Sequence, residues 1–209
     1  MRLKDFQPYI RRLLAEFSGF RSNRDLVIAH PVNRILRGFC FDRSIEKTAF
    51  YVNAFIQPLY EPFTTIALTL GERLEPYGWH STESGVADEI VDAVRTKGLP
   101  LIEAGRSPER LADWLAIRYA GPKPSSVQRP YAYSLAAAHR FDEAVVELER
   151  LRVLLAKAER KADWEVEMAA EVEQLMDTIK NRPDEVDALL EQWEEVTLSH
   201  LATEYGRLR

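Results

Sequence analysis

This sequence has very little cysteine, and it shows neither a long apolar run nor the pattern of a leader segment. The chain has 209 residues and a single cysteine, Cys40, so it cannot form an internal disulfide. No apolar run approaches the ~18 residues that are needed to span a bilayer. Residues 1–6 lack the apolar segment of a signal peptide. We therefore expect a cytoplasmic protein that does not enter a membrane.

Motifs for catalysis and for cofactor binding are also missing. There is no glycine-rich dinucleotide loop and no nucleophile elbow. Residues 121–126 contain the residue types of a phosphate-binding loop in the wrong order, and their prolines remove backbone donors. The four histidines, His30, His80, His139 and His200, are too scattered to share a metal ion. The sequence therefore predicts no cofactor and no metal, and it favours a non-catalytic protein over an enzyme.

The charges that are present are unevenly distributed. Hydrophobic residues make up 46% of the chain and charged residues 29%, as in ordinary globular proteins. Residues 1–80 hold 11 basic and 8 acidic side chains, a balance of +3, whereas residues 81–209 hold 17 and 25, a balance of −8. The net charge of −5 opposes non-specific binding of nucleic acid. The acidic second part favours a basic protein partner.

The front of the chain shows the patterns of one helix and four strands. Apolar residues at steps of three and four predict a helix over 4–17. Runs of β-type residues predict strands over 26–29, 35–42, 48–57 and 63–70. The connections between these runs are short, so we expect an antiparallel meander of three or four strands.

Only the helical step is found after residue 70. Residues 71–84 are expected to form a loop, and the helix beginning near Val86 is expected to end at Gly98 and Pro100. Further helices are predicted from Ser107 to about 120, and over about 130–139, 141–160, 163–180 and 184–205. The fold class is therefore α+β, with residues 1–80 forming a helix and an antiparallel sheet and residues 81–209 an all-helical region that contains a soft linker at 121–130.

Two stretches resemble known families. Residues 131–155, with small residues before His139 and then Phe141-Asp142-Glu143-Ala144, resemble one helical hairpin of a tetratricopeptide repeat, although such repeats usually have glycine at the position of His139. No second copy follows at the ~34-residue period. Gly19-Phe20-Arg21 and Phe50-Tyr51-Val52-Asn53 resemble parts of small bacterial helix-plus-meander domains that are found near toxin and immunity genes. Both resemblances imply a role in protein binding.

Three groups of residues are candidates for an interaction surface. Arg34, Arg37 and Arg43 could form a basic patch beside the sheet. Trp79, next to His80 in a predicted loop, is expected to be the most exposed tryptophan. The acidic candidates are Glu191, Glu194 and Glu195.

The leading hypothesis is a non-catalytic protein–protein interaction protein of the bacterial cytosol, immunity-like or adaptor-like, with a basic partner. One alternative is binding of RNA or single-stranded DNA, because Arg37-Gly38-Phe39-Cys40-Phe41 matches half of an RNA-binding strand signature. Another alternative is an enzyme for a small molecule, with Asn53, Arg37, His30 and His80 near a pocket. A pairing of Cys40 with His30 or His80 as a nucleophile is disfavoured, since Cys40 lies between two phenylalanines. The sequence leaves a homodimer open.

Overall fold

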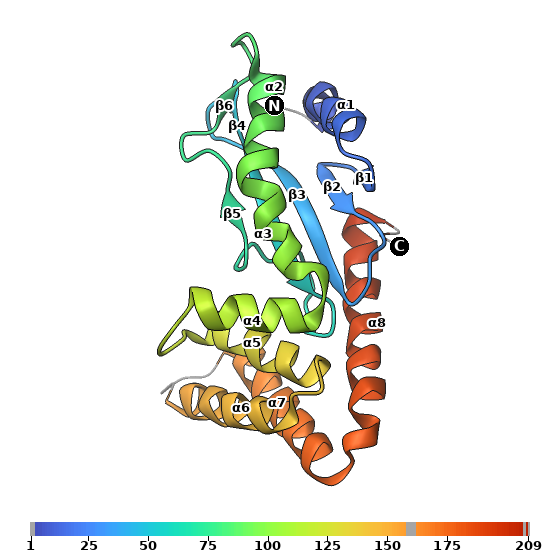
Figure 1. Ribbon diagram of the computed structural model, residues 1–209, viewed down its shortest axis with the longest axis vertical. Coiled ribbons are helices and arrows are strands. Elements are labelled where there is room, and N and C mark those ends of the chain that lie inside the picture. Colours follow the sequence, from blue (N-terminus) through green and yellow to red (C-terminus); the bar gives the residue numbers. More distant parts are fainter. Residues whose placement is uncertain (1–2, 158–161, 207, 209) are drawn as a thin grey trace. The chain divides into compact units, whose positions relative to one another are not determined.

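The computed structural model describes residues 3–157, 162–206 and 208, and its fold is α+β, as predicted (Figure 1). The chain forms two compact units. The first comprises residues 1–57, 63–106 and 198–209, and the second comprises residues 58–62 and 107–197. The units therefore do not follow a division at residue 80, since residues 81–106 belong with the sheet.

An antiparallel sheet forms the centre of the first unit. Its strands are β1 (Phe20–Asn23), β2 (Leu26–Ala29), β3 (Ile35–Arg43), β4 (Ala49–Pro58), β5 (Glu72–Arg73) and β6 (Trp79–His80). The strand order is β1-β2-β3-β4-β5, and β6 also pairs with β4. The strands predicted over 26–29, 35–42 and 48–57 are thus confirmed as β2, β3 and β4, and β1 was not predicted. β1 forms a hairpin with β2 through a two-residue turn in which Arg24 has a φ of 56°.

The strand predicted over residues 63–70 is wrong. These residues have no regular secondary structure. The segment contacts β4 through a side chain and not through backbone ladder hydrogen bonds, since the Ala67 amide donates to Gln57 Oε1 at 2.9 Å. On the side of β4 away from β3, its partners β5 and β6 come from the segment that was expected to be a loop. Gly71 brings this segment onto β4, since a Cβ there would lie 2.7 Å from the carbonyl oxygen of Ala54.

Helices cover one face of the sheet. The first is α1 (Gln7–Glu16), which follows a 3-10 turn (Leu3–Phe6). The second is a long helical run. It consists of α2 (Val86–Ala93), a π-helical turn (Val94–Gly98), α3 (Leu99–Glu103) and a 3-10 turn (Ala104–Arg106). Figure 1 shows α2 and α3 following one another along the sheet. The rings of Phe6 and Phe41 pack on Phe50 in this layer, with centroids 5.7 and 6.3 Å away.

The helix that was predicted to end at Gly98 and Pro100 continues through both residues. Pro100 lies in the first turn of α3, where its missing N–H is not needed. Gly98 serves close packing, because a Cβ at this position would lie 2.5 Å from Cε1 of Phe39 in β3. The glycine is therefore a contact point between helix and sheet and not a helix stop.

The other face of the sheet is covered by the last part of α8 (Val186–Tyr205) and by the irregular segment after β4. Thr65 donates to Glu204 Oε2 at 3.2 Å, and Leu201 is fully buried. Adjacent strand residues point to opposite faces. Cys40, which follows Phe39, therefore faces this second layer.

The second unit is helical, and α5 forms its core. It contains α4 (Pro108–Arg118), α5 (Ser125–Ala137), α6 (Phe141–Ala156), α7 (Asp163–Asn181), a 3-10 turn (Pro183–Glu185) and the first part of α8. Residues 127–137 of α5 are all buried. The predicted linker 121–130 is therefore wrong in its second half, because residues 125–130 form the first turns of α5 and Pro130 lies inside the helix.

The described residues after His80 contain no strand, but β5 and β6 follow residue 70, so the change to helical structure comes later than the sequence pattern predicted. Ser107 caps α4 as expected, with its hydroxyl accepting from the Arg110 amide at 3.4 Å. α5 and α6 are joined by a tight turn in which His139 has a φ of 57°. In residues 3–157 and 162–206, no helix combines the length and the apolar character that crossing a membrane requires.

Candidate functional site

The predicted exposed aromatic, Trp79, is buried. Its side chain is 4% exposed, and its ring lies 6.3 Å from that of Phe50. The expectation failed because Trp79 pairs with Phe50 as part of β6 instead of lying in a loop. Tyr77, two residues earlier, is the exposed aromatic of this segment at 87%. His80 contacts the sheet hairpin, with Nδ1 3.5 Å from Glu46 Oε1.

The predicted basic patch is not one continuous surface. Arg37 is half-buried, and burial lowers the pKa of its guanidinium. Its charged neighbours are Glu103 and Arg106 on the helical layer. Arg43 is exposed at the other end of β3, and six strand residues correspond to ~20 Å. Arg34 is half-buried before the strand begins.

The predicted acidic residues of α8 have different environments. Glu191 and Glu195 are exposed, whereas Glu194 is 4% exposed and therefore does not belong to an open surface. The reason is helical geometry, because Glu194 shares the inward face with Leu190 and Thr197, which are fully buried.

The strand Arg37–Phe41 offers little to a nucleobase or to a reaction. Phe39 and Phe41 are buried in the core, so their rings cannot stack on bases in this fold. Burial, with Asp25 and Asp42 nearby, raises the pKa of Cys40 to about 12, which leaves a protonated thiol at neutral pH. Among the described residues there is no group of three or more His, Cys, Asp or Glu side chains that could hold a metal ion.

A buried ion cluster ties residues 58–62 to the helices of the second unit. Arg129 in α5 lies between two carboxylates, with Nε 3.4 Å from Glu61 Oε1 and Nη2 2.7 Å from Glu171 Oε2. Thr197 donates to the carbonyl oxygen of Glu61 at 3.1 Å. Burial raises the pKa of Glu61 to about 7, although the nearby Arg129 charge opposes this shift. No sequence pattern predicts this pairing, since Arg129 lies in the stretch that was expected to be a linker.

Two large apolar side chains are exposed where α7 begins. Trp164 is 55% exposed and Val166 is 54% exposed. They alternate with Asp163, Glu165 and Glu167, and we call residues 163–167 the α7 start surface. The helical step of the sequence puts Trp164 on one stripe with four later apolar residues, Met168, Val172, Leu175 and Ile179. Those four are buried, whereas Trp164 is not.

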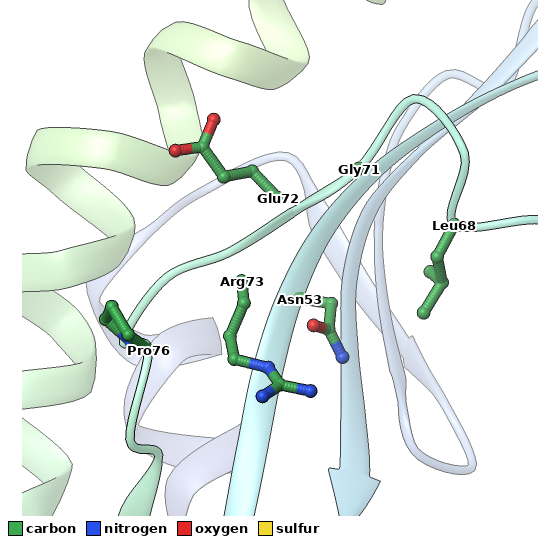
Figure 2. A pocket seen from close by; sticks show the side chains of 6 residues that line it. All are labelled: Asn53, Leu68, Gly71, Glu72, Arg73 and Pro76. Carbon is green, nitrogen blue, oxygen red and sulfur yellow. The ribbon is translucent and has the colours of Figure 1, made fainter.

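A pocket of about 500 Å³ opens on the first unit where β4 meets β5. Its lining residues are Asn53, Leu68, Gly71, Glu72, Arg73 and Pro76 (Figure 2). Asn53 and Arg73 are paired across the two strands, and in Figure 2 their side chains extend to the same side while Glu72 points away. The Arg73 guanidinium lies 3.7 Å from the centroid of the Tyr51 ring.

Of the four residues that were predicted to lie near a small-molecule pocket, one lines this pocket. Asn53 lines it, whereas Arg37, His30 and His80 do not. Arg73 and Tyr51 were not singled out from the sequence, because a two-residue strand such as β5 carries no periodicity.

Comparison with family models, with curated proteins and with solved structures gives no match to this chain, so its function has to be argued from its own residues.

Proposed function

We propose that this chain is a non-catalytic protein–protein interaction protein of the cytoplasm, whose helical unit binds a basic protein partner. The observation that carries the proposal is the α7 start surface, where Trp164 and Val166 are more than half exposed between three carboxylates. The single cysteine supports the choice of a reducing compartment.

Helix stability accounts for the acidic residues of this surface but not for the apolar ones. Asp163 and Glu165 lie in the first turn of α7, where negative charge is favoured by the helix dipole. Glu165 also accepts from the Ala162 amide at 2.9 Å. Trp164 and Val166 gain no comparable benefit from water. Leaving a large apolar side chain exposed forgoes about 1.5–3 kcal/mol of burial free energy.

A protein partner would recover that burial. Tryptophan is among the residues most enriched at the energetic centres of interfaces. Charge complementarity selects the partner, because residues 140–209 hold 18 acidic and 10 basic side chains. Exposed Glu191 and Glu195 on α8 add to this field. A cationic partner would be attracted at a rate that falls as salt rises.

A capture experiment with the full chain tests this proposal. The tagged protein is incubated with native lysate in parallel with Trp164→Ala, Glu167→Lys and Tyr77→Ala. Tyr77→Ala is the matched control, because it removes an aromatic side chain that is 87% exposed in the first unit. Circular dichroism verifies that all four proteins are folded.

We expect the wild type and Tyr77→Ala to retain the same basic protein, and Trp164→Ala and Glu167→Lys to lose it. Retention should also fall as salt rises from about 50 to 500 mM, over which charges become screened. A toxin or nuclease as the captured protein would give the chain an immunity role. Identical capture by the wild type and Trp164→Ala would contradict the proposal.

A further inference from the structure

Asn53 is a largely buried residue whose side-chain amide faces the pocket. The residue is 6% exposed, and its backbone is paired with Arg73. An amide that faces a pocket offers both donors and an acceptor to a bound molecule. The Asn53 side chain lines the pocket, so a bound molecule can supply a partner.

Arg73 places a cationic group beside this amide. Its guanidinium is stacked on Tyr51 at 3.7 Å, which holds the plane of the group, and no carboxylate pairs with it in the part of the chain that the structure describes. Residues directly opposite in an antiparallel pair have Cβ atoms about 4.5–5.5 Å apart. One small anion can therefore reach both Arg73 and Asn53, which face the same side in Figure 2.

We propose that this pocket binds the carboxylate of a small organic acid, with Arg73 and Asn53 donating to the two carboxylate oxygens. The planar guanidinium matches a carboxylate in a bidentate geometry. The Asn53 carbonyl remains free to accept from a neighbouring hydroxyl or ammonium group of the ligand. Leu68 and Pro76 provide apolar walls for the carbon skeleton, and a volume of about 500 Å³ is typical of a small-molecule site.

The lining favours a monoanion over a dianion. Arg73 is the one cationic residue among the six that line the pocket, and Glu72 points away from its guanidinium in Figure 2. One guanidinium balances the single charge of a carboxylate but leaves half of the charge of a phosphate dianion unbalanced. This inference concerns the first unit alone and does not depend on the proposed protein partner.

The test is a titration of the ¹⁵N-labelled full chain with benzoate, followed by NMR. The side-chain amide signals of Asn53 and the Nε–H signal of Arg73 report on the pocket directly. We expect both to shift and to saturate with a dissociation constant of roughly 1–10 mM, as befits a ligand of this size. The neutral analogue benzamide and inorganic phosphate should not shift them.

Three variants complete the test. Arg73→Gln and Asn53→Leu should each weaken benzoate binding at least about tenfold. Arg43→Gln, which removes an exposed arginine from β3, should bind as the wild type does. Absence of saturable shifts, equal binding of benzamide, or tighter binding of phosphate would each overturn the proposal.

Discussion

Replacing Glu61 with glutamine should change how the stability of the second unit depends on pH. Burial raises the pKa of Glu61 from its usual value of 4.5 to about 7. Between these pH values the folded protein keeps a proton at Glu61 that the unfolded chain releases. The resulting stability is fully present below pH 4.5 and is lost as the pH rises through 7. At about 1.4 kcal/mol per pH unit, the loss amounts to about 3 kcal/mol.

Glutamine has no proton to lose, so the variant should not show this loss. Arg129 keeps a charged partner in the variant, because Glu171 Oε2 lies 2.7 Å from its Nη2. The free energy of unfolding of Glu61→Gln, minus that of the wild type, should therefore increase by about 3 kcal/mol between pH 4.5 and 8. Titrating groups that lie far from Glu61 are common to both proteins and cancel in this difference.

Urea unfolding followed by tryptophan fluorescence measures the difference. A Trp79→Phe background in both proteins restricts the signal to the second unit, which holds the other three tryptophans. Glu191→Gln is the matched control, since that glutamate is exposed on α8 and its replacement should give no pH-dependent difference. Parallel pH profiles for Glu61→Gln and the wild type would refute the reasoning.

Three further predictions concern single positions. Gly98→Ala should lower the free energy of unfolding by about 1–3 kcal/mol in urea titrations, because the added Cβ would lie 2.5 Å from the Phe39 ring and this overpacking outweighs the better helix propensity of alanine. His139 has a φ of 57°, a conformation that glycine adopts easily and valine does not. His139→Gly should leave the free energy of unfolding unchanged or raise it by up to about 1 kcal/mol, and His139→Val should lower it by about 1–2 kcal/mol. Equal thermal midpoints for the two variants would contradict this. Cys40, with its pKa raised to about 12 by burial, should react with Ellman's reagent at about pH 8 roughly a thousandfold more slowly in the native protein than in urea, and comparable rates would show that the thiolate is accessible.

Elements with a long, uninterrupted pattern could be predicted from the sequence. β4 and the buried stripe of α7 are examples. β4 is a ten-residue run of β-type residues that is buried on both faces, and the period-3.6 stripe of α7 reflects burial on one face. Trp164 fits the same stripe yet is exposed, because the pattern does not show where a helix projects beyond the core it packs on. The alternation in residues 63–70 similarly resembles a strand, although Leu68 is partly exposed and the segment has no ladder partner.

Glycine and proline were over-interpreted as breaks. Gly98 and Pro100 predicted the end of a helix, whereas the tertiary contact with Phe39 requires a glycine inside a continuing helical run. Residues 125–130 were assigned to a linker on the strength of their proline-rich surroundings, although they begin the most buried helix of the second unit.

The candidate sites depend on pairings that sequence distance conceals. Arg73 lies opposite Asn53 only because the chain returns to β4 after an irregular segment. Glu61 and Arg129 are 68 positions apart, and neither has a local pattern that predicts its partner. Predicting either site would have required the register of the sheet or the packing of α5, and a single sequence contains neither.

The order of the chain through the two units has a consequence for how the protein is made and dissected. Residues 198–209 belong to the sheet-containing unit, yet the whole helical unit is synthesised before them. The first unit thus lacks the fully buried Leu201 until residues 107–197 have been translated. A fragment that stops at residue 106 would leave apolar surface uncovered, so proteolytic separation of the two units should yield an aggregation-prone sheet and not an independent domain.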